Sequence, residues 1–412
     1  MSSRSMASKP RTGSSRDNSK NLRGITVTAF SFLAVFAAGS AAIPLFATYR
    51  TENGVTDSEL SLVAVGYFLC AVSSLLMLGR LSDFLGRKPV SVAALLTAAL
   101  GCAVLTGVNG FWPLLAGRAL QGIAAGLASS ALAAFIVDCA PARPKWIVPA
   151  LTTAGSTVGL SLGVFASGAL VQYGPFPRQL PYAVLGAVLV VCAVLLLVVQ
   201  ETVHRRPGAV ASLRPKLKMP AKARPYLLVA SFVFVSTWAV GGFFNAFGPS
   251  VAVDYLGSSA PLVAAAVFAS YMVPSAIGGP LAGRMSVVAA QRLGMSAFAV
   301  AVIGLAAATA IGSAALFIGC GILGGAGMGL AMNGSMASLL SRANAAERAG
   351  VLSLIYAISY TGSALPALVV GQLSHVISLL AITCGYAGLG VLAWAATLLG
   401  TRTSNTLSSN PN

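Results

Sequence analysis

Charged side chains are scarce in this sequence. Only 8% of its 412 residues are charged, whereas about 25% are charged in a typical soluble protein. Apolar residues make up 57%, and the mean hydropathy is +0.84. They occur in runs of about 20 residues, the length of helix that crosses roughly 30 Å of hydrocarbon. The composition therefore excludes a soluble domain and predicts membrane-spanning helices, each of which satisfies its own backbone hydrogen bonds.

Residues that carry catalytic or metal chemistry are also few. The two histidines, His204 and His375, stand alone, and the six cysteines form no C-x-x-C pair. A metal site and a disulfide framework are therefore not expected. The sequence contains no G-x-x-x-x-G-K-[ST] phosphate-binding loop, which argues against an ATP-driven process. We expect no enzyme activity and no cofactor.

Twelve apolar runs are long enough to span a membrane. They lie near residues 25–47, 59–79, 90–108, 112–136, 148–172, 181–199, 226–248, 261–283, 293–311, 314–340, 349–372 and 378–399. The first run follows a polar, basic segment and is too long for the hydrophobic region of a cleaved signal peptide. The expected fold class is an all-α membrane protein with twelve transmembrane helices.

The charged residues are distributed unequally between the two ends of the spans. With the N-terminus inside, every Lys and Arg except Arg50, Arg118 and Arg178 falls in the inner loops and tails. This positive-inside bias places both termini in the cytoplasm. The net charge of +17 then reflects topology, so we expect the lipid bilayer as a partner and no nucleic acid.

A basic, proline-rich segment divides the spans into two groups of six. It runs from His204 to Arg224 and predicts a flexible cytoplasmic linker, with a basic amphipathic surface helix as the alternative. Short motifs recur on both sides at a nearly constant offset: Gly79-Arg80-Leu81-Ser82 returns as Gly283-Arg284-Met285-Ser286. Such parallel repeats predict two pseudo-symmetric six-helix bundles around a central substrate site.

The expected division of the chain follows from this pattern. It comprises a disordered basic tail over residues 1–24, an N-terminal bundle over 25–200, a linker over 201–225, a C-terminal bundle over 226–400 and a cytoplasmic C-terminal tail over 401–412.

The densest group of charges lies between the second and third spans. This loop reads Gly79-Arg80-Leu81-Ser82-Asp83-Phe84-Leu85-Gly86-Arg87-Lys88-Pro89. Its pattern G-x-L-x-D-x-x-G-R-K resembles the signature loop between helices two and three of the major facilitator superfamily of secondary transporters. The second copy has Val287 at the position of Asp83, so only the first half keeps the acid.

The resemblance implies a role in gating for this loop. Asp83 and Arg87 are four residues apart and can pair across one helical turn. In the superfamily, the loop and an acid at the end of the fourth helix are thought to form a charge network that stabilises the outward-open state, and Asp138 lies at that place here. The candidate gating residues are Gly79, Arg80, Asp83, Gly86, Arg87, Lys88 and Asp138. The alternative is that the cations only determine topology.

Arg118 is the single cation inside a span. Arg at the centre of a membrane helix costs roughly 2.5–3.5 kcal/mol on insertion scales, so it is a functional candidate unless it snorkels to the outer interface. The R-x-x-Q-G pattern from Arg118 to Gly122 is similar to a superfamily motif linked to proton coupling in drug/proton antiporters. Glu59 and Asp138, the acids nearest to membrane depth, are the other proton-coupling candidates. Leu160 replaces the proline of the G-P-x-x-G motif that such antiporters carry.

Polar and aromatic residues within the spans are the candidates for substrate contact. They are Gln121, Trp238, Asn245, Tyr271, Asn333, Tyr356 and Tyr360. Trp and Tyr also occur at membrane interfaces, which is the alternative for each aromatic residue. Because the set is weakly polar, we expect a hydrophobic or amphipathic small-molecule substrate.

The sequence as a whole resembles the twelve-helix drug/proton antiporter branch of the superfamily. The resemblance implies a monomeric transporter of the bacterial inner (plasma) membrane that exports a drug or metabolite in exchange for protons. Proton-coupled uptake of a small metabolite is the first alternative. A membrane receptor or scaffold that does not transport is the second.

Overall fold

The computed structural model describes residues 14–140, 151–152, 155–214, 219–254, 257–344, 347–373 and 376–408. His375 lies outside this part of the chain. Twelve helical segments of the described residues are long and apolar enough to cross a membrane, which confirms the predicted fold class.

Six spans form the N-terminal half. They are α1 (Ser14–Ser40) with η1 (Ile43–Leu45) and α2 (Phe46–Asn53), α3 (Asp57–Leu78), α5 (Arg87–Leu105), α6 (Phe111–Leu127) with η2 (Ala128–Leu132) and α7 (Ala133–Cys139), α9 (Gly155–Tyr173), and α10 (Leu180–Leu197). Six more form the C-terminal half. They are α12 (Arg224–Asp254), α13 (Pro261–Ser275) with α14 (Gly278–Ala282), α15 (Val287–Ile311), α16 (Ala314–Leu340), α17 (Arg348–Leu373) and α18 (Leu379–Ser408).

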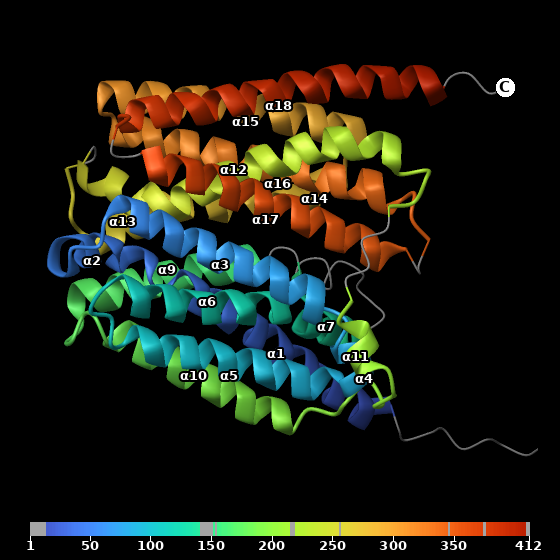
Figure 1. The fold of residues 1–412 in the computed structure, drawn as a ribbon. Coiled ribbons are helices and arrows are strands. Elements are labelled where there is room, and N and C mark those ends of the chain that lie inside the picture. Colours follow the sequence, from blue (N-terminus) through green and yellow to red (C-terminus); the bar gives the residue numbers. More distant parts are fainter. Residues whose placement is uncertain are drawn as a thin grey trace, which may run out of the picture.

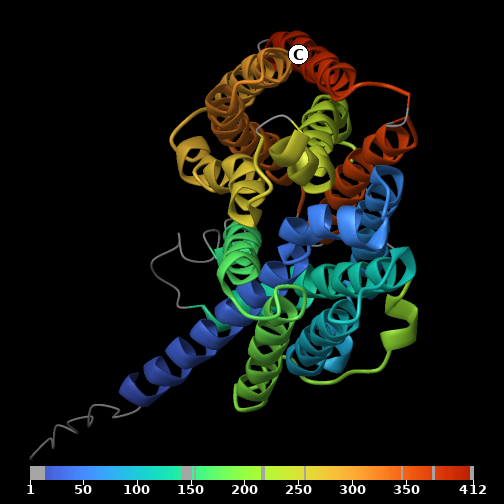
Figure 2. The same cartoon turned by 90° about the vertical axis from the view of Figure 1, so that its left-hand side faces the viewer.

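The two halves form separate bundles that lie side by side. Figure 1 shows the N-terminal bundle in blue to green and the C-terminal bundle in yellow to red. Figure 2 looks nearly along the helices and shows the same two groups. Across the boundary, α3 packs against α17 and α9 packs against α13. The predicted pair of six-helix bundles is confirmed.

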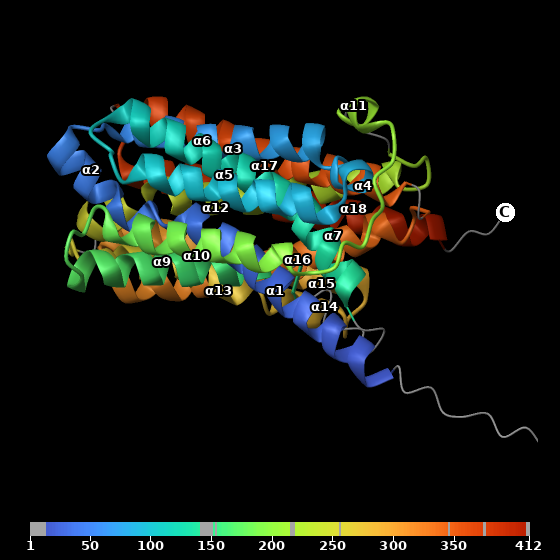
Figure 3. The same cartoon turned by 90° about the horizontal axis from the view of Figure 1, so that it is seen from below.

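The long helices share one direction, so the molecule has two distinct ends. We call the end at which α2 lies the outer end, following the predicted topology. The other end, called the inner end, carries the short helices α4 (Ser82–Leu85) and α11 (Ala209–Ser212) and the last turns of α18, as Figure 3 shows. The start of α1 lies at the inner end too.

Glycines allow the closest helix pairs to form. A side chain at Gly122 on α6 would overlap the backbone of Tyr67 on α3, and one at Gly325 on α16 would overlap the backbone of Tyr271 on α13. Small residues at such positions let two membrane helices approach closely and gain dispersion energy. The repeated G-x-x-x-G motif therefore serves the same packing role in both halves.

The helices extend further at the chain ends than the hydropathy pattern indicates. Helix α1 begins at Ser14, inside the segment predicted to be disordered, and α18 continues to Ser408, into the predicted C-terminal tail. The linker also has structure. The Arg206 backbone N–H donates to the Phe84 carbonyl over 3.0 Å, and α11 packs against α4. This part of the linker thus lies against the N-terminal bundle, because its backbone finds partners there.

Candidate functional site

Arg87 lies between two carboxylates at the inner end. Its Nη1 is 2.6 Å from Asp83 Oδ1, and its Nε is 3.0 Å from Asp138 Oδ2. Helix α5 supplies the arginine, α4 supplies Asp83, and the last turn of α7 supplies Asp138. The predicted contact of Arg87 with both acids is confirmed. The guanidinium side chain is only 14% exposed, and charge-assisted hydrogen bonds of this kind are stronger than neutral ones.

Glu201 completes this group, and sequence reasoning missed it. One carboxylate oxygen accepts the Arg87 backbone N–H at 2.8 Å, and the other accepts the Lys88 N–H at 2.9 Å. These are orphan donors of the α5 N-terminus, where the helix dipole favours a negative charge. We call Asp83, Arg87, Asp138 and Glu201 the inner charge cluster. A signal for Glu201 exists in the sequence: it is an acid just after the sixth span, while α5 begins at a glycine that has no capping side chain.

Gly86 makes room for the Glu201 carboxylate. Its φ of +103° is a backbone conformation that other residues rarely adopt, and a Cβ placed there would lie 2.5 Å from Glu201 Oε2. The glycine of the loop motif is therefore required by both backbone conformation and space.

The remaining members of the loop hold its two flanking helices. The Gly79 N–H donates to the Leu75 carbonyl and closes the end of α3. Lys88 Nζ donates to the Leu197 carbonyl over 3.0 Å, at the C-terminus of α10. Arg80 Nη1 is buried and has no hydrogen-bond partner among the described residues.

The second copy of the loop forms no equivalent cluster. Val287 begins α15 where the first half has Asp83, and Ser286 caps that helix by accepting the Ala289 N–H at 3.2 Å. Arg284 is exposed and forms no ion pair within the described ranges. The inner charge cluster thus belongs to the N-terminal half alone.

Arg118 is fully buried inside the N-terminal bundle. Its Nη1 donates to the Gly39 carbonyl on α1 and, over 3.0 Å, to Gln121 Oε1 on its own helix. Its guanidinium carbon lies 4.3 Å from the centre of the Tyr67 ring on α3, a cation–π contact. The side chain is 0% exposed, so it does not snorkel to the outer interface. No ion pair of Arg118 occurs in the described part of the chain.

The three proton-coupling candidates lie apart from one another. Glu59 lies at the outer end of α3, where it forms a capping box with Thr56; the Thr56 N–H donates to Glu59 Oε2 over 2.8 Å. Asp138 is bound by Arg87 at the inner end. Arg118 therefore lies between two acids that are already engaged, and it contacts neither of them.

Three substrate candidates come together at the boundary between the halves. The Trp238 and Tyr360 ring centres are 4.8 Å apart, and those of Tyr356 and Tyr360 are 6.4 Å apart. Phe68 of the N-terminal half approaches the Tyr360 ring at 6.1 Å. We call these four residues the interface aromatic cluster. Trp238 Nε1 is buried and has no hydrogen-bond partner among the residues described.

The other substrate candidates lie elsewhere. Tyr271 is in the core of the C-terminal bundle, where its hydroxyl donates to the Thr237 carbonyl over 2.8 Å. Gln121 is bound to Arg118. Asn333 donates to the Gly329 carbonyl of its own helix over 2.8 Å. Asn245 is buried, and its Oδ1 has no partner in the described residues. Sequence reasoning missed Phe68 because an apolar ring in a span carries no distinguishing signal.

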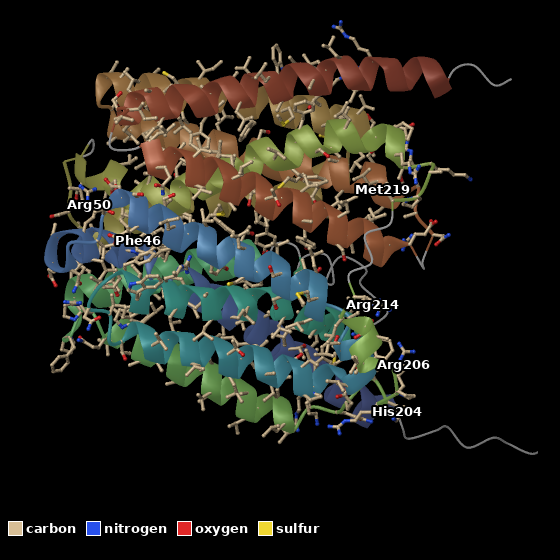
Figure 4. All side chains as sticks on the ribbon, in the orientation of Figure 1. Phe46, Arg50, His204, Arg206, Arg214 and Met219 are labelled. Atoms are coloured by element: carbon tan, nitrogen blue, oxygen red, sulfur yellow. The ribbon has the colours of Figure 1, made fainter. Side chains whose placement is uncertain are left out.

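A polar contact joins the two halves at the outer end. Arg50 Nη1 lies 3.4 Å from Asp57 Oδ1 and donates to Ser250 Oγ on α12 over 3.0 Å. The Ser250 hydroxyl in turn donates to Asp57 Oδ1 over 3.3 Å. We call these three residues the outer contact. Figure 4 shows Arg50 at the outer end, near Phe46.

Two further hydrogen bonds between the halves lie toward the outer end. Besides the outer contact, Ser61 donates to the Ala367 carbonyl, and the Leu262 N–H donates to Gln172 over 3.4 Å. The structure therefore joins the two bundles near their outer ends.

The chain was also compared with known proteins. A sequence profile described as "Major Facilitator Superfamily" matches residues 28–367. The tetracycline resistance protein, class C, of Escherichia coli is 31% identical over 156 residues, which are 38% of this chain and 38% of that protein. The bacillibactin exporter of Bacillus subtilis (strain 168) is 35% identical over 101 residues, 23% of this chain and 25% of the exporter.

A relative with a different named activity also matches. The mouse (Mus musculus) solute carrier family 2, facilitated glucose transporter member 6, is 32% identical over 115 residues, 28% of this chain and 22% of the transporter. Each of these alignments spans less than half of the relative's own length.

Proposed function

We propose, since the chain belongs to the major facilitator superfamily of membrane transporters, that it exports a hydrophobic or amphipathic small molecule in exchange for protons. The interface aromatic cluster carries this proposal. It places four rings where two bundles meet, and rings of this kind bind apolar surface while leaving a polar handle. The unpartnered Trp238 Nε1 offers one hydrogen-bond donor to a bound molecule. A substrate with a large apolar body and at least one acceptor atom fits this set.

Movement of the two halves about this site would carry the substrate across the membrane. Secondary transporters of duplicated design expose a midplane site alternately by rocking one bundle against the other. In the state described here, the outer contact joins the halves, whereas the inner charge cluster lies within one half. This pattern supports a state closed to the outside, and the outer contact has to break for release of substrate there.

The buried Arg118 supports a role in proton coupling. An unpaired guanidinium in the interior of a membrane bundle is costly, and such groups mark ion and proton pathways. The cation would respond to the protonation of a nearby group or water and would bias the packing of α1, α3 and α6 around it.

Two relatives support export rather than import. One is named as a resistance protein and one as an exporter, and both come from bacteria. The bias of Lys and Arg toward the inner loops supports a place in the bacterial inner membrane with both termini in the cytoplasm. Uptake is the alternative, which the similarity to a facilitated glucose transporter favours.

A compound screen in everted membrane vesicles tests the proposal. A pH-sensitive dye reports proton movement when an amphipathic compound is added, and vesicles that lack the protein are the control. Export in exchange for protons predicts dye recovery with a subset of the compounds. The absence of any proton movement across a broad library would overturn proton antiport, and accumulation of a nutrient by intact cells would indicate uptake.

A further inference from the structure

A pocket of about 610 Å³ opens at the inner end of the N-terminal bundle. It lies between the start of α5, the end of α10 and the first residues of the linker. Its lining residues are Leu85, Lys88, Pro89, Val92, Leu197, Glu201, Val203, His204 and Arg205. The pocket borders the inner charge cluster through Glu201, but no proposed transport step places a ligand in it.

The pocket lies on the lipid side of the bundle. Helices α5 and α10 form its edge farthest from the C-terminal half (Figure 1). Leu197 is 58% exposed and Val198 is 82% exposed, so the last turn of α10 presents apolar side chains outward. Apolar residues at the end of a membrane helix, with the cations Arg205 and Arg206 a few residues further along the chain, mark the depth at which hydrocarbon meets lipid headgroups.

The walls and the rim of the pocket differ in character. Leu85, Pro89, Val92 and Leu197 provide apolar walls, and the rim carries the Lys88 and Arg205 cations together with His204. The side chains of His204 and Arg205 are exposed and take part in no hydrogen bond or ion pair within the part of the chain described. Figure 4 shows His204 at this edge of the inner end.

The acid in the pocket does not oppose a bound anion strongly. The Glu201 oxygens accept the backbone N–H groups of Arg87, Lys88 and Thr202 at 2.8 to 2.9 Å. These donors and the dipole of α5 balance its charge, so the two rim cations leave the pocket attractive to anions. Arg206 holds the linker over the pocket, because its Nε donates to the Asp83 carbonyl over 3.0 Å.

We propose that this pocket binds a phospholipid with an anionic headgroup from the inner leaflet. Its phosphate lies between Lys88 and Arg205, and an acyl chain follows Val92 and Leu197 along the groove between α5 and α10. Basic pockets at the cytoplasmic ends of membrane helices bind such headgroups, and each nearby cation contributes to the affinity. The apolar walls favour a lipid over a soluble phosphate, which has no chain to bury.

Native mass spectrometry of the purified full-length protein tests this site. The protein is titrated with phosphatidylglycerol or phosphatidylcholine in detergent, and bound lipids are counted. We expect phosphatidylglycerol to bind more tightly and Arg205→Ala to weaken its binding about fivefold, the effect of one cation near an anionic headgroup. Arg214→Ala is the matched control, because Arg214 is an exposed cation of the same linker that does not line the pocket. It is expected to change binding less than twofold.

Three results would overturn the proposal. Equal weakening by both variants would show diffuse attraction by the linker charges. No weakening by Arg205→Ala would exclude the pocket. Competition by glycerol 1-phosphate as strong as that by phosphatidylglycerol would indicate a site for soluble phosphate. The measurement involves no transport, so it stands or fails independently of the direction of export and of its coupling to protons.

Discussion

Ser250 of the C-terminal half accepts a hydrogen bond from Arg50 of the N-terminal half, with 3.0 Å between Oγ and Nη1. Because Asp57 contacts both residues, the three groups form a polar connection between two bundles that separate at this end in the proposed transport cycle. The Arg50 and Asp57 side chains are 31% and 34% exposed, so solvent weakens the connection and makes it reversible.

Replacing Ser250 should shift the protein toward an outer-open state. Ser250→Ala removes the hydroxyl that links the halves, and partly exposed ionic contacts contribute about 0.2–1 kcal/mol. We therefore expect a shift of up to about fivefold in the ratio of the two states. Spin labels at the exposed residues Thr51 and Ser259 would report it as a longer distance by double electron–electron resonance.

Arg178→Ala is the control for this experiment. It breaks an outer ion pair of 3.1 Å with Glu52, but both residues belong to the N-terminal half. Its distance distribution should equal that of the wild type. If Ser250→Ala also leaves the distribution unchanged, the outer contact has no role in closing this end.

Loss of the inner charge cluster should slow transport without weakening substrate binding. Neither Asp83→Asn nor Arg87→Ala removes a group near the interface aromatic cluster, so KM should stay within twofold while kcat falls several-fold. Initial rates in proteoliposomes measure both. Arg284→Ala, in the copy of the loop that forms no cluster, should leave both constants unchanged. If both cluster variants keep wild-type turnover, the loop has no role in gating and its charges only determine the membrane topology.

Replacement of Arg118 should abolish proton coupling without lowering the stability of the fold. Arg118→Met keeps a flexible unbranched side chain in place of the aliphatic part of the arginine and removes a buried charge that costs roughly 2.5–3.5 kcal/mol on insertion scales, while Gln121 loses a partner. The Tm should therefore stay within about 2 °C of wild type or rise, whereas substrate-driven proton movement should be lost. A large fall in Tm together with intact proton movement would assign Arg118 a structural role only.

The Trp238 indole N–H should increase the binding affinity only of substrates that can accept a hydrogen bond. Trp238→Phe keeps an aromatic ring and removes the donor, and one hydrogen bond contributes about 0.5–1.5 kcal/mol. Binding of such substrates, measured by isothermal titration calorimetry, should weaken about fivefold. Trp112, which is 74% exposed at the start of α6, gives the matched variant Trp112→Phe with no expected change. Equal affinities for all three proteins would place the substrate elsewhere.

Gly86→Ala should release the start of the linker. The unfavourable backbone conformation costs about 1–3 kcal/mol for a residue other than glycine, and the new methyl group would displace the Glu201 carboxylate. Trypsin should then cleave after Arg205 faster than in the wild type; the bond after Arg206 is resistant because Pro207 follows it. In Gly110→Ala, the added Cβ meets no atom within 4 Å on an extended backbone with φ of 165°, so cleavage should be unchanged. Identical cleavage rates would show that Glu201 is held by other contacts.

The global architecture was predictable because hydrocarbon imposes strong rules on a sequence. Span length, the Lys and Arg bias and the repeated glycine motifs each report a separate physical requirement, and together they predicted two bundles of six helices. The Asp83–Arg87 pair was predicted from a spacing of four residues, although the two residues lie on different helices that are separated by Gly86 with its φ of +103°. Asp138 required the family resemblance, since its contact with Arg87 joins residues that are far apart in the sequence.

The composition of the sites was less predictable. Glu201 binds backbone N–H groups, which carry no residue identity, so its place just after the sixth span was a weak signal and was missed. Tyr271 and Gln121 were predicted to contact substrate because they are polar, yet each satisfies its polar group within its own bundle. Which face of a helix meets the other half depends on packing between distant segments, and a single sequence does not report it.

The docked linker leaves only a short piece of chain to connect the two moving bodies. Residues up to Arg214 follow the N-terminal bundle through α11, and Met219 packs with the core of the C-terminal bundle around Phe234; Figure 4 marks both residues at the inner end. The chain between them can reach at most about 18 Å when fully extended. In the proposed transport cycle, this length limits how far the two bundles can separate at the inner end.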